Sequence, residues 1–379
     1  MESSTPLVLL VGPRPDPPYR GGVEKGVDLL LHTNLARQTR MRVFNNYRPL
    51  DPSRPIWEKI VYQAGKLLSF LRELRHSPVV LVHVKTSSGV NFYQNSLYVL
   101  LARLRGLPVV LQIHTGRLKT FYENNGPLNR AWVRRTLTAA SRVATLSQSW
   151  AEYVHSIAPR ARVAVIPNGL DVSELSTLRE PGERRRNQVL FLGAGRQDLD
   201  RDKGLEDLLP VLPAVARRHP ESRWVLAGLA DPADVRLRLE REGLTETGLA
   251  GRVSCMGVVF GEEKQILLKQ SSILVMPSYI DNFPNLLLEA MATGMAAVTS
   301  DLGAMPDMLG HGEGGLQVPT SDRAGLFSAL DTLLSSPARV EAMGNRNQEV
   351  VSREYTLDVV QRKLKVLYRE AAGLSASIL

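Results

Sequence analysis

Residues 188–227 read QVLFLGAGRQDLDRDKGLEDLLPVLPAVARRHPESRWVLA, and this stretch decides the fold. A short apolar run at 189–193 leads into a loop with two glycines, and a segment with the apolar spacing of an amphipathic helix starts near Leu205. A second apolar run at 224–227 follows. Short apolar runs that alternate with helical segments are typical of a parallel sheet covered by helices.

The same alternation runs through the whole chain and restarts near residue 188. A polar segment at 179–187, rich in turn residues and without an apolar face, separates the halves and is interpreted as a linker. The sequence therefore predicts an α/β protein with two open parallel sheets. We expect strands at 7–11, 79–84, 109–113, 143–146 and 163–166 in the first half, and at 189–193, 224–227, 253–256, 273–276 and 297–299 in the second.

These boundaries give two domains and a C-terminal extension. We expect domains at 1–175 and 176–355, because a chain of 379 residues exceeds the usual size of one compact domain. The segment 356–379 contains an amphipathic pattern at 357–372 and is expected to form a helix that packs back toward the first domain. In open parallel sheets, ligands bind at the carboxyl ends of the strands, so the functional residues should lie there.

The composition excludes several classes of protein. The single cysteine, Cys255, allows neither a disulfide framework nor a thiolate metal site, and a buried core side chain is its expected role. No apolar stretch reaches the eighteen or so residues of a membrane span, and the run at 7–11 is too short for a signal peptide. We therefore expect a cytoplasmic protein.

The net charge of +9 is concentrated in the first half. Residues 1–175 carry 23 Lys and Arg against 11 Asp and Glu, whereas the rest of the chain carries 24 against 27. This asymmetry indicates an anionic partner for the first half, such as a phosphorylated substrate or an anionic membrane. Nucleic acid is not expected as a partner, because no helix-turn-helix, zinc-finger or aromatic-basic RNA-binding pattern is present.

Two glycine-containing loops are candidate sites for a phosphate group. Gly21 and Gly22 precede a predicted helix and allow close approach of a ligand, although a simple turn explains them equally well. The spacing fits neither a dinucleotide fingerprint nor a Walker A loop. In the second half, Arg196 and Lys203 flank one loop and could bind a diphosphate, with an exposed polar loop as the alternative.

The second loop also contains three carboxylates, which raise the question of a metal site. They could form an oxygen cage, but an EF-hand needs glycine at the sixth position and glutamate at the twelfth, where Lys203 and Leu209 stand. Acidic residues near a helix start are also explained by the helix dipole. We expect no metal here. The carboxylates are those of Asp198, Asp200 and Asp202.

The longest candidate segment is 277–294, PSYIDNFPNLLLEAMATG. We expect a helix here with Asn282 as its N-cap, Pro284 near its first position and its end at Gly294. Glu289 lies within an otherwise apolar run, so it needs a partner when buried, either ribose hydroxyls or a neighbouring Arg or Lys. His114 follows the predicted strand at 109–113 and is expected to point toward the carboxyl edge of the sheet, with a structural histidine as the alternative.

Together these segments resemble family 4 of the retaining glycosyltransferases, which have the GT-B fold of two Rossmann-like domains facing each other across a cleft. The resemblance extends from the loop at 21–24 through Pro167-Asn168-Gly169-Leu170-Asp171 to the region near Asp322, and 277–294 with its continuation at 298–301 is its most specific part. It implies that the first domain binds the acceptor and the second binds a nucleotide sugar.

The resemblance assigns roles to individual residues. It places the donor diphosphate on Arg196 and Lys203, the ribose on Glu289 and the base at Gly257. Two positions depart from the family, which usually has glutamate at Asp281 and proline at Ala296. The implied catalytic residues are His114, Arg196, Lys203 and Asp281, and the implied donor-binding residues are Gly21, Gly22, Arg196, Lys203, Gly257, Phe283, Pro284, Asn285, Leu286, Leu287 and Glu289.

The implied activity is hexosyl transfer from a UDP- or GDP-sugar to a hydroxyl acceptor, with retention of anomeric configuration and no cofactor or metal. The acceptor would be a glycan, a lipid-linked molecule or a small molecule, in glycan or glycoconjugate biosynthesis. A sugar phosphorylase, a sugar-nucleotide epimerase and a non-catalytic partner subunit are the alternatives.

The basic first domain also suggests a peripheral contact with the inner face of an anionic membrane. The segment 57–75 combines apolar and basic residues in a pattern that fits an interfacial helix, with packing against its own sheet as the alternative. A second basic region contains Arg117, Lys119, Arg130, Arg134 and Arg135.

Overall fold

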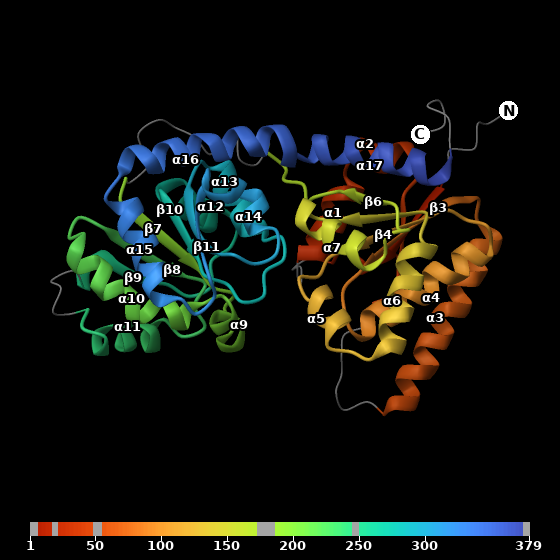
Figure 1. Cartoon of the computed structure of the whole chain (residues 1–379), viewed down its shortest axis with the longest axis horizontal. Coiled ribbons are helices and arrows are strands. Elements are labelled where there is room, and N and C mark those ends of the chain that lie inside the picture. Colours follow the sequence, from red (N-terminus) through yellow and green to blue (C-terminus); the bar gives the residue numbers. More distant parts are fainter. Residues whose placement is uncertain (1–6, 17–21, 48–54, 173–185, 245–249, 374–379) are drawn as a thin grey trace. The chain divides into compact units, whose positions relative to one another are not determined.

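The computed structural model describes residues 7–16, 22–47, 55–172, 186–244 and 250–373 (Figure 1). The chain divides into two compact units. Unit 1 consists of Met1–Gly169 and Leu357–Leu379, and unit 2 of Leu170–Thr356. The expected domain boundary at 175/176 lies outside the described residues, and the division found in the structure follows Gly169.

Unit 1 is built on a parallel six-stranded sheet with the order β2-β1-β3-β4-β5-β6. The central strands are buried on both faces, which explains their continuous apolar sequences. The strands are β1 (Leu7–Gly12), β2 (Arg42–Asn45), β3 (Val79–Thr86), β4 (Val109–Ile113), β5 (Arg142–Thr145) and β6 (Val163–Val165).

Helices cover both faces of this sheet. Phe70, Val99 and Val133 pack on the core of one face, and Val27, Leu364 and Tyr368 pack on the core of the other. The helices are α1 (Gly22–Leu31), α2 (Asn34–Gln38), α3 (Ile56–His76), α4 (Val90–Leu104), α5 (Leu118–Glu123), α6 (Pro127–Ala139), α7 (Gln148–Ile157) and α17 (Leu357–Ala372). The C-terminal helix α17 contacts β3, β4 and α1, so the last described helix completes the core of unit 1.

Unit 2 has a second parallel six-stranded sheet, with the order β12-β11-β10-β7-β8-β9. Its strands are β7 (Gln188–Leu192), β8 (Arg223–Ala227), β9 (Val253–Cys255), β10 (Ile273–Met276), β11 (Ala296–Ser300) and β12 (Gly315–Val318). Its helices are α9 (Gln197–Asp202), α10 (Leu205–Arg218), α11 (Pro232–Arg241), α12 (Gly261–Gln270), α13 (Asn285–Ala292), α14 (Met305–Met308), α15 (Arg323–Leu334) and α16 (Pro337–Val350), with short helical turns η2 (Ala250–Arg252), η3 (Gly310–Gly312) and η4 (Val351–Tyr355).

The ten predicted strands are all present, and their ends differ from the prediction by at most two residues. The sequence missed β2 and β12, which form one outer edge of each sheet. Their short sequences, RVFN and GLQV, contain at most two consecutive apolar residues, so they lack the longer apolar run that is typical of a buried strand. The two-sheet α/β architecture is therefore as expected.

Each sheet has one point at which the strand order reverses. In unit 1 the reversal lies between β1 and β3, and in unit 2 between β7 and β10. Ligands of open parallel sheets bind beside the carboxyl ends of the two strands at such a point. The loops that follow these four strands are therefore where a site is expected in each unit.

Candidate functional site

The loop after β7 is fixed to the loop after β8 by a close backbone approach. The N–H of Gly195 donates to the carbonyl of Gly228 at 2.7 Å. A Cβ atom on Gly228 would lie 2.6 Å from the carbonyl oxygen of Gly193, and Gly228 has a φ of +69°. Only glycine fits at Gly228, and the two loops therefore form one rigid edge.

Asp200, on the short helix α9, joins the same two loops. Its buried carboxylate accepts hydrogen bonds from the backbone N–H groups of Ala194 at 2.7 Å and Ala230 at 2.8 Å. Asp198 instead forms an exposed ion pair with Arg196 at 2.9 Å. Two of the three carboxylates considered for a metal cage thus have protein partners, and in the described ranges no three His, Cys, Asp or Glu side chains are grouped to hold a metal ion.

Lys203 and Asp281 meet at the reversal point of unit 2. Lys203 follows α9, and Asp281 lies in the loop after β10. Both carboxylate oxygens of Asp281 lie 2.7 Å from Nζ of Lys203. The two side chains are 22% and 15% exposed, so this ion pair is largely shielded from water. The structure therefore brings together two of the residues that the sequence marked.

Backbone contacts hold the Lys203 loop against the loop after β10. Gly204 has a φ of +86°, and a Cβ atom there would collide with the carbonyl of Pro277. The N–H of Tyr279 donates to the carbonyl of Asp202 at 2.8 Å, and the hydroxyl of Ser278 donates to the same oxygen at 3.2 Å. The position of Lys203 is thus set by rigid backbone on both sides.

Arg196 and Gly257 are placed near the same edge of the sheet. Arg196 is the N-terminal cap residue of α9, directly after Gly195, and its side chain is 67% exposed. Gly257 follows β9, and its carbonyl accepts a hydrogen bond from the N–H of Gly228 at 2.8 Å. Both residues therefore belong to the connected loops after β7, β8 and β9. The contact of Arg196 is with Asp198 on its own helix.

The segment after Asp281 differs from the prediction in where its helix starts. Helix α13 begins at Asn285 with Pro284 as its N-cap, so the expected cap at Asn282 was wrong. The carbonyl of Asn282 accepts a hydrogen bond from the N–H of Ala304 at 2.6 Å and is thus used in a loop contact. The ring of Phe283 packs edge-on against Tyr355, with centroids 5.6 Å apart, and the Leu287 side chain is fully buried.

Glu289 has a cationic partner that the sequence did not identify. It lies on the buried face of α13 and forms an ion pair with Lys264 of α12. The sequence left a ribose and a neighbouring cation as alternative partners, and the structure supplies the cation. No motif marks Lys264, which lies in an ordinary charged helix, so sequence reasoning had no signal for it.

In unit 1, His114 lies at the carboxyl end of β4, as predicted. Its N–H donates to the carbonyl of Thr86 at 2.8 Å, and its ring Nε2 lies 3.3 Å from Nζ of Lys85. Burial, followed by the charge of Lys85, lowers the pKa of His114 well below its usual value. The ring is therefore neutral at neutral pH.

Lys85 was not singled out by the sequence, because the predicted strand stopped at residue 84. The structure extends β3 to Thr86 and buries Lys85 within it, with 7% of the residue exposed. Burial lowers the pKa of Lys85 to about 7. A lysine that continues an apolar strand is the signal that could have identified it.

The first glycine loop is only partly described. Gly22 is the first residue of α1, so the predicted helix after the loop is present. Gly21 lies outside the described residues. Gly12, at the end of β1, faces Lys85 on the neighbouring strand, since a Cβ atom there would lie 3.7 Å from Cβ of Lys85.

Comparison with known families covers both units. Residues 10–174 match the family described as Glycosyltransferase Family 4, and residues 186–336 match Glycosyl transferases group 1. The chain belongs to glycosyltransferase family 4. This assignment agrees with the resemblance drawn from the motifs, and the two parallel sheets agree with its GT-B fold.

One curated relative supports the same family assignment, and two solved structures share the fold. The glycosyltransferase is 28% identical to a phosphatidyl-myo-inositol mannosyltransferase of Mycobacterium leprae, over 94% of this chain and 95% of the relative. Among solved structures, sucrose-phosphate synthase from Thermosynechococcus elongatus is similar with a TM-score of 0.71 at 20% identity, covering 98% of this chain and 100% of that one. HepE of Anabaena, solved in complex with UDP-glucose, has a TM-score of 0.62 at 17% identity, covering 95% and 99%.

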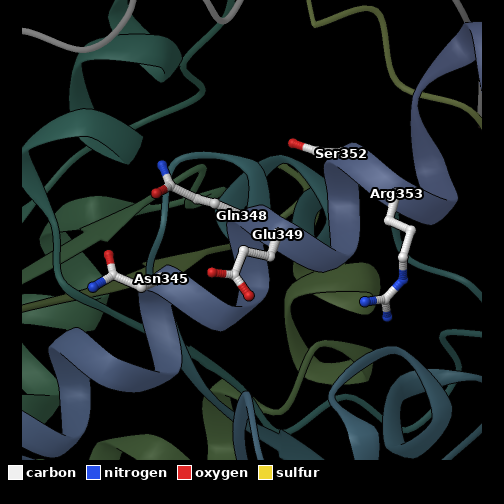
Figure 2. Close-up of a pocket in the computed structure, with 5 residues that line it drawn as sticks. All are labelled: Asn345, Gln348, Glu349, Ser352 and Arg353. Atoms are coloured by element: carbon white, nitrogen blue, oxygen red, sulfur yellow. The ribbon is translucent and has the colours of Figure 1, made fainter.

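Two further observations concern the surface of the glycosyltransferase. Within the described ranges, no helix has both the length and the apolar character needed to cross a bilayer. A surface depression of about 730 Å³ lies along α16 and η4 (Figure 2) and includes none of the residues marked by the sequence. It is lined by Asn345, Gln348, Glu349, Ser352 and Arg353.

Proposed function

We propose that this glycosyltransferase transfers a hexose from a UDP- or GDP-sugar to a hydroxyl acceptor with retention of configuration and without a metal ion. The observation that carries the proposal is the placement of Lys203 and Asp281 between the carboxyl ends of β7 and β10. Structures of the similar HepE with UDP-glucose support a nucleotide sugar as donor. The mannosyltransferase relative supports hexosyl transfer to a hydroxyl acceptor.

The proposed chemistry is electrostatic. As the sugar C1–O bond breaks, negative charge grows on the departing diphosphate, and a fixed cation near that charge lowers the barrier. Lys203 is such a cation, because rigid backbone holds it at the reversal point. The exposed side chain of Arg196 supplies a second cation, because its guanidinium group can leave Asp198 and bind the diphosphate. The acceptor hydroxyl then attacks C1 from the face that the leaving group vacates, and its proton passes to the departing diphosphate.

Loss of the cation at Lys203 tests this proposal. Lys203→Ala should lower the transfer rate by about 10²-fold or more, because a group that stabilises developing charge is removed. Arg201→Ala is the matched control, since Arg201 lies on the same short helix with an exposed side chain. Equal transfer rates for wild type and Lys203→Ala would overturn the role of Lys203.

The donor base can be identified by ligand stabilisation. A nucleotide sugar at a hundred times its dissociation constant should stabilise the protein by about 2.7 kcal/mol. Screening UDP- and GDP-sugars by thermal unfolding thus separates the two, and no stabilisation by either would contradict the proposed donor class.

Product analysis separates the alternative activities. A phosphorylase would require inorganic phosphate and release a sugar phosphate, and an epimerase would release free sugar without an acceptor. A non-catalytic subunit would give neither transfer nor donor hydrolysis.

An exposed apolar stripe on α3 supports a peripheral membrane contact at the cytoplasmic face. Trp57, Ile60, Val61 and Leu68 follow helical spacing and are between 59% and 64% exposed. Packing against the sheet of unit 1, the alternative interpretation of α3, applies around Phe70, which is buried. The exposed Lys59, Arg72 and Arg75 add positive charge to α3, which suits an anionic lipid surface.

Vesicle binding tests this contact. Wild type should co-sediment with vesicles that contain phosphatidylglycerol, and the Trp57→Ser, Ile60→Ser variant should bind far less because it loses two inserted side chains. Leu237→Ser, at an exposed apolar residue of unit 2, is the control. Equal binding of wild type and the double variant would contradict a contact through α3.

A further inference from the structure

A chain of buried polar side chains runs through unit 1 from α17 to His114. The hydroxyl of Tyr368 lies 2.6 Å from Nδ1 of His83, and Nε2 of His83 lies 3.1 Å from Oε1 of Gln112. Nζ of Lys85 lies 3.0 Å from the same Oε1 and 3.3 Å from Nε2 of His114. Tyr368, His83, Gln112 and Lys85 are all buried, so these contacts are isolated from water.

The side-chain amide of Gln112 determines which atoms of His83 and Tyr368 carry protons. Lys85 can only donate as an ammonium group, so the atom of Gln112 that it meets must be the oxygen, and Gln112 Nε2 donates to the carbonyl of Ile166 at 3.4 Å. Because Oε1 only accepts, Nε2 of His83 must carry a proton. Nδ1 of His83 then accepts from the hydroxyl of Tyr368.

The same reasoning applies at the His114 end. The ammonium group of Lys85 donates to Nε2 of His114, so this nitrogen carries no proton in the neutral ring. The single proton of the His114 ring is then on Nδ1. Within the described part of the chain, this contact with Lys85 is the one hydrogen bond that the His114 ring makes, since the hydrogen bond to Thr86 involves the backbone of His114.

Lys85 stands at the reversal point of unit 1, near the carboxyl end of β3 and beside Gly12 of β1. No carboxylate in the described ranges forms an ion pair with it. The titratable groups around it are His83 on its own strand, His114 after β4 and Tyr368 of α17 beyond His83. A charged side chain in this setting costs stability, so a purely structural role would be served better by an apolar residue.

We propose that Lys85 is a positioning residue that holds His114 as the Nδ1–H tautomer and thereby presents a single, oriented N–H donor to the sugar. This inference rests on the proposed function, together with the catalytic role that the family resemblance implies for His114, but the tautomer itself is a property of the free protein. Lys85 acts through His114 and is not assigned a contact with the substrate.

Nitrogen NMR of the histidine rings tests the tautomer. In protein labelled with ¹⁵N-histidine at about pH 6.5, where Lys85 is mostly charged, His114 should carry its proton on Nδ1. The His114→Asn variant identifies the signal. In Lys85→Met the Nε2–H tautomer should become populated, because the donor to Nε2 is lost. A proton on Nε2 in wild type, or an unchanged tautomer in folded Lys85→Met, would overturn the inference.

A control variant separates Lys85 from the rest of the chain of contacts. Tyr368→Phe removes the hydroxyl at the opposite end and should leave the His114 signal as in wild type. A shift as large as that in Lys85→Met would show that the whole network, rather than Lys85, sets the tautomer. If Lys85→Met does not fold, the wild-type spectrum still decides the question.

Kinetics test the functional half of the inference. Lys85→Met should lower kcat by about 10²-fold, since a misplaced group near the reacting atoms costs about that much. Its dissociation constant for UDP or GDP should not change, because the nucleotide is assigned to unit 2. A wild-type kcat in Lys85→Met would overturn the positioning role. A wild-type protein that transfers no sugar, yet shows the Nδ1–H tautomer, would count against the proposed function alone.

Discussion

The buried lysine of β3 should make the stability of unit 1 depend on pH in a defined direction. Burial lowers the pKa of Lys85 from 10.5 to about 7. Between these values the unfolded chain binds a proton that the folded chain does not, so the free energy of unfolding rises with pH. The slope is at most about 1.4 kcal/mol per pH unit, which gives a gain of about 2 kcal/mol from pH 7 to pH 9.

Comparison of Lys85→Met with wild type isolates this effect. The variant lacks the ionisable group, so the difference in unfolding free energy, wild type minus variant, should increase by about 2 kcal/mol over that range. The histidines near Lys85 do not interfere, because the pKa values of His83 and His114 are lowered further below this range. Below pH 7 the difference should level off, since Lys85 is then charged in both states.

Urea unfolding followed by tryptophan fluorescence is a suitable assay. Three of the four tryptophans, Trp57, Trp132 and Trp150, belong to unit 1, so the signal reports mainly on the unit that contains Lys85. The difference should be measured at several pH values from 7 to 9 with the same slope m for both proteins. A difference that stays constant over this range would show that Lys85 titrates as an ordinary exposed lysine, and the argument from burial would fail.

Two further predictions concern unit 2. Asp281→Asn should strengthen binding of UDP or GDP by roughly tenfold, because Lys203 loses a carboxylate that competes with the diphosphate. The control Asp198→Asn, in an exposed ion pair, should change binding less than about threefold. Calorimetry measures both affinities, and weaker binding by Asp281→Asn would contradict the competition. Gly204→Ala should destabilise the protein by about 2 kcal/mol or more, because φ is +86° and Cβ meets the Pro277 carbonyl. Gly251→Ala is the control, because nothing lies within 4 Å of the new Cβ, and it should change stability by less than about 0.5 kcal/mol. Equal melting curves for the two variants would contradict the steric argument.

The sequence revealed the fold wherever burial on both faces of a strand imposes an apolar run. It failed at β2 and β12, whose sequences RVFN and GLQV contain at most two consecutive apolar residues. Gly315 of β12 is buried, and a Cβ atom there would collide with the carbonyl of Ala297. The start of α13 was missed for a different reason. Pro284 and Asn282 carry ordinary helix-start signals, but the carbonyl of Asn282 is bound to Ala304, a contact that only the folded chain brings about.

For the site, the sequence could mark residues but not their partners. Lys203 and Asp281 are 78 positions apart, and their pairing follows from the adjacency of β7 and β10. Lys264 and Lys85 carry no motif, so only the packing of α12 against Glu289 and of β3 beside β4 identifies them. Cys255, expected in the core, packs partly buried against it, and burial raises the pKa of its thiol.

The division of the chain also has a consequence for its synthesis. Unit 2 is one continuous segment, Leu170–Thr356, inserted between the two parts of unit 1. The core on one face of the first sheet needs Val360, Leu364, Leu367 and Tyr368, which are synthesised only after all of unit 2. Unit 2 can therefore fold before unit 1 is complete, and during that time one apolar face of the unit 1 sheet lacks the helix that covers it. Loss of α17 through premature termination would leave that face exposed and prone to aggregation.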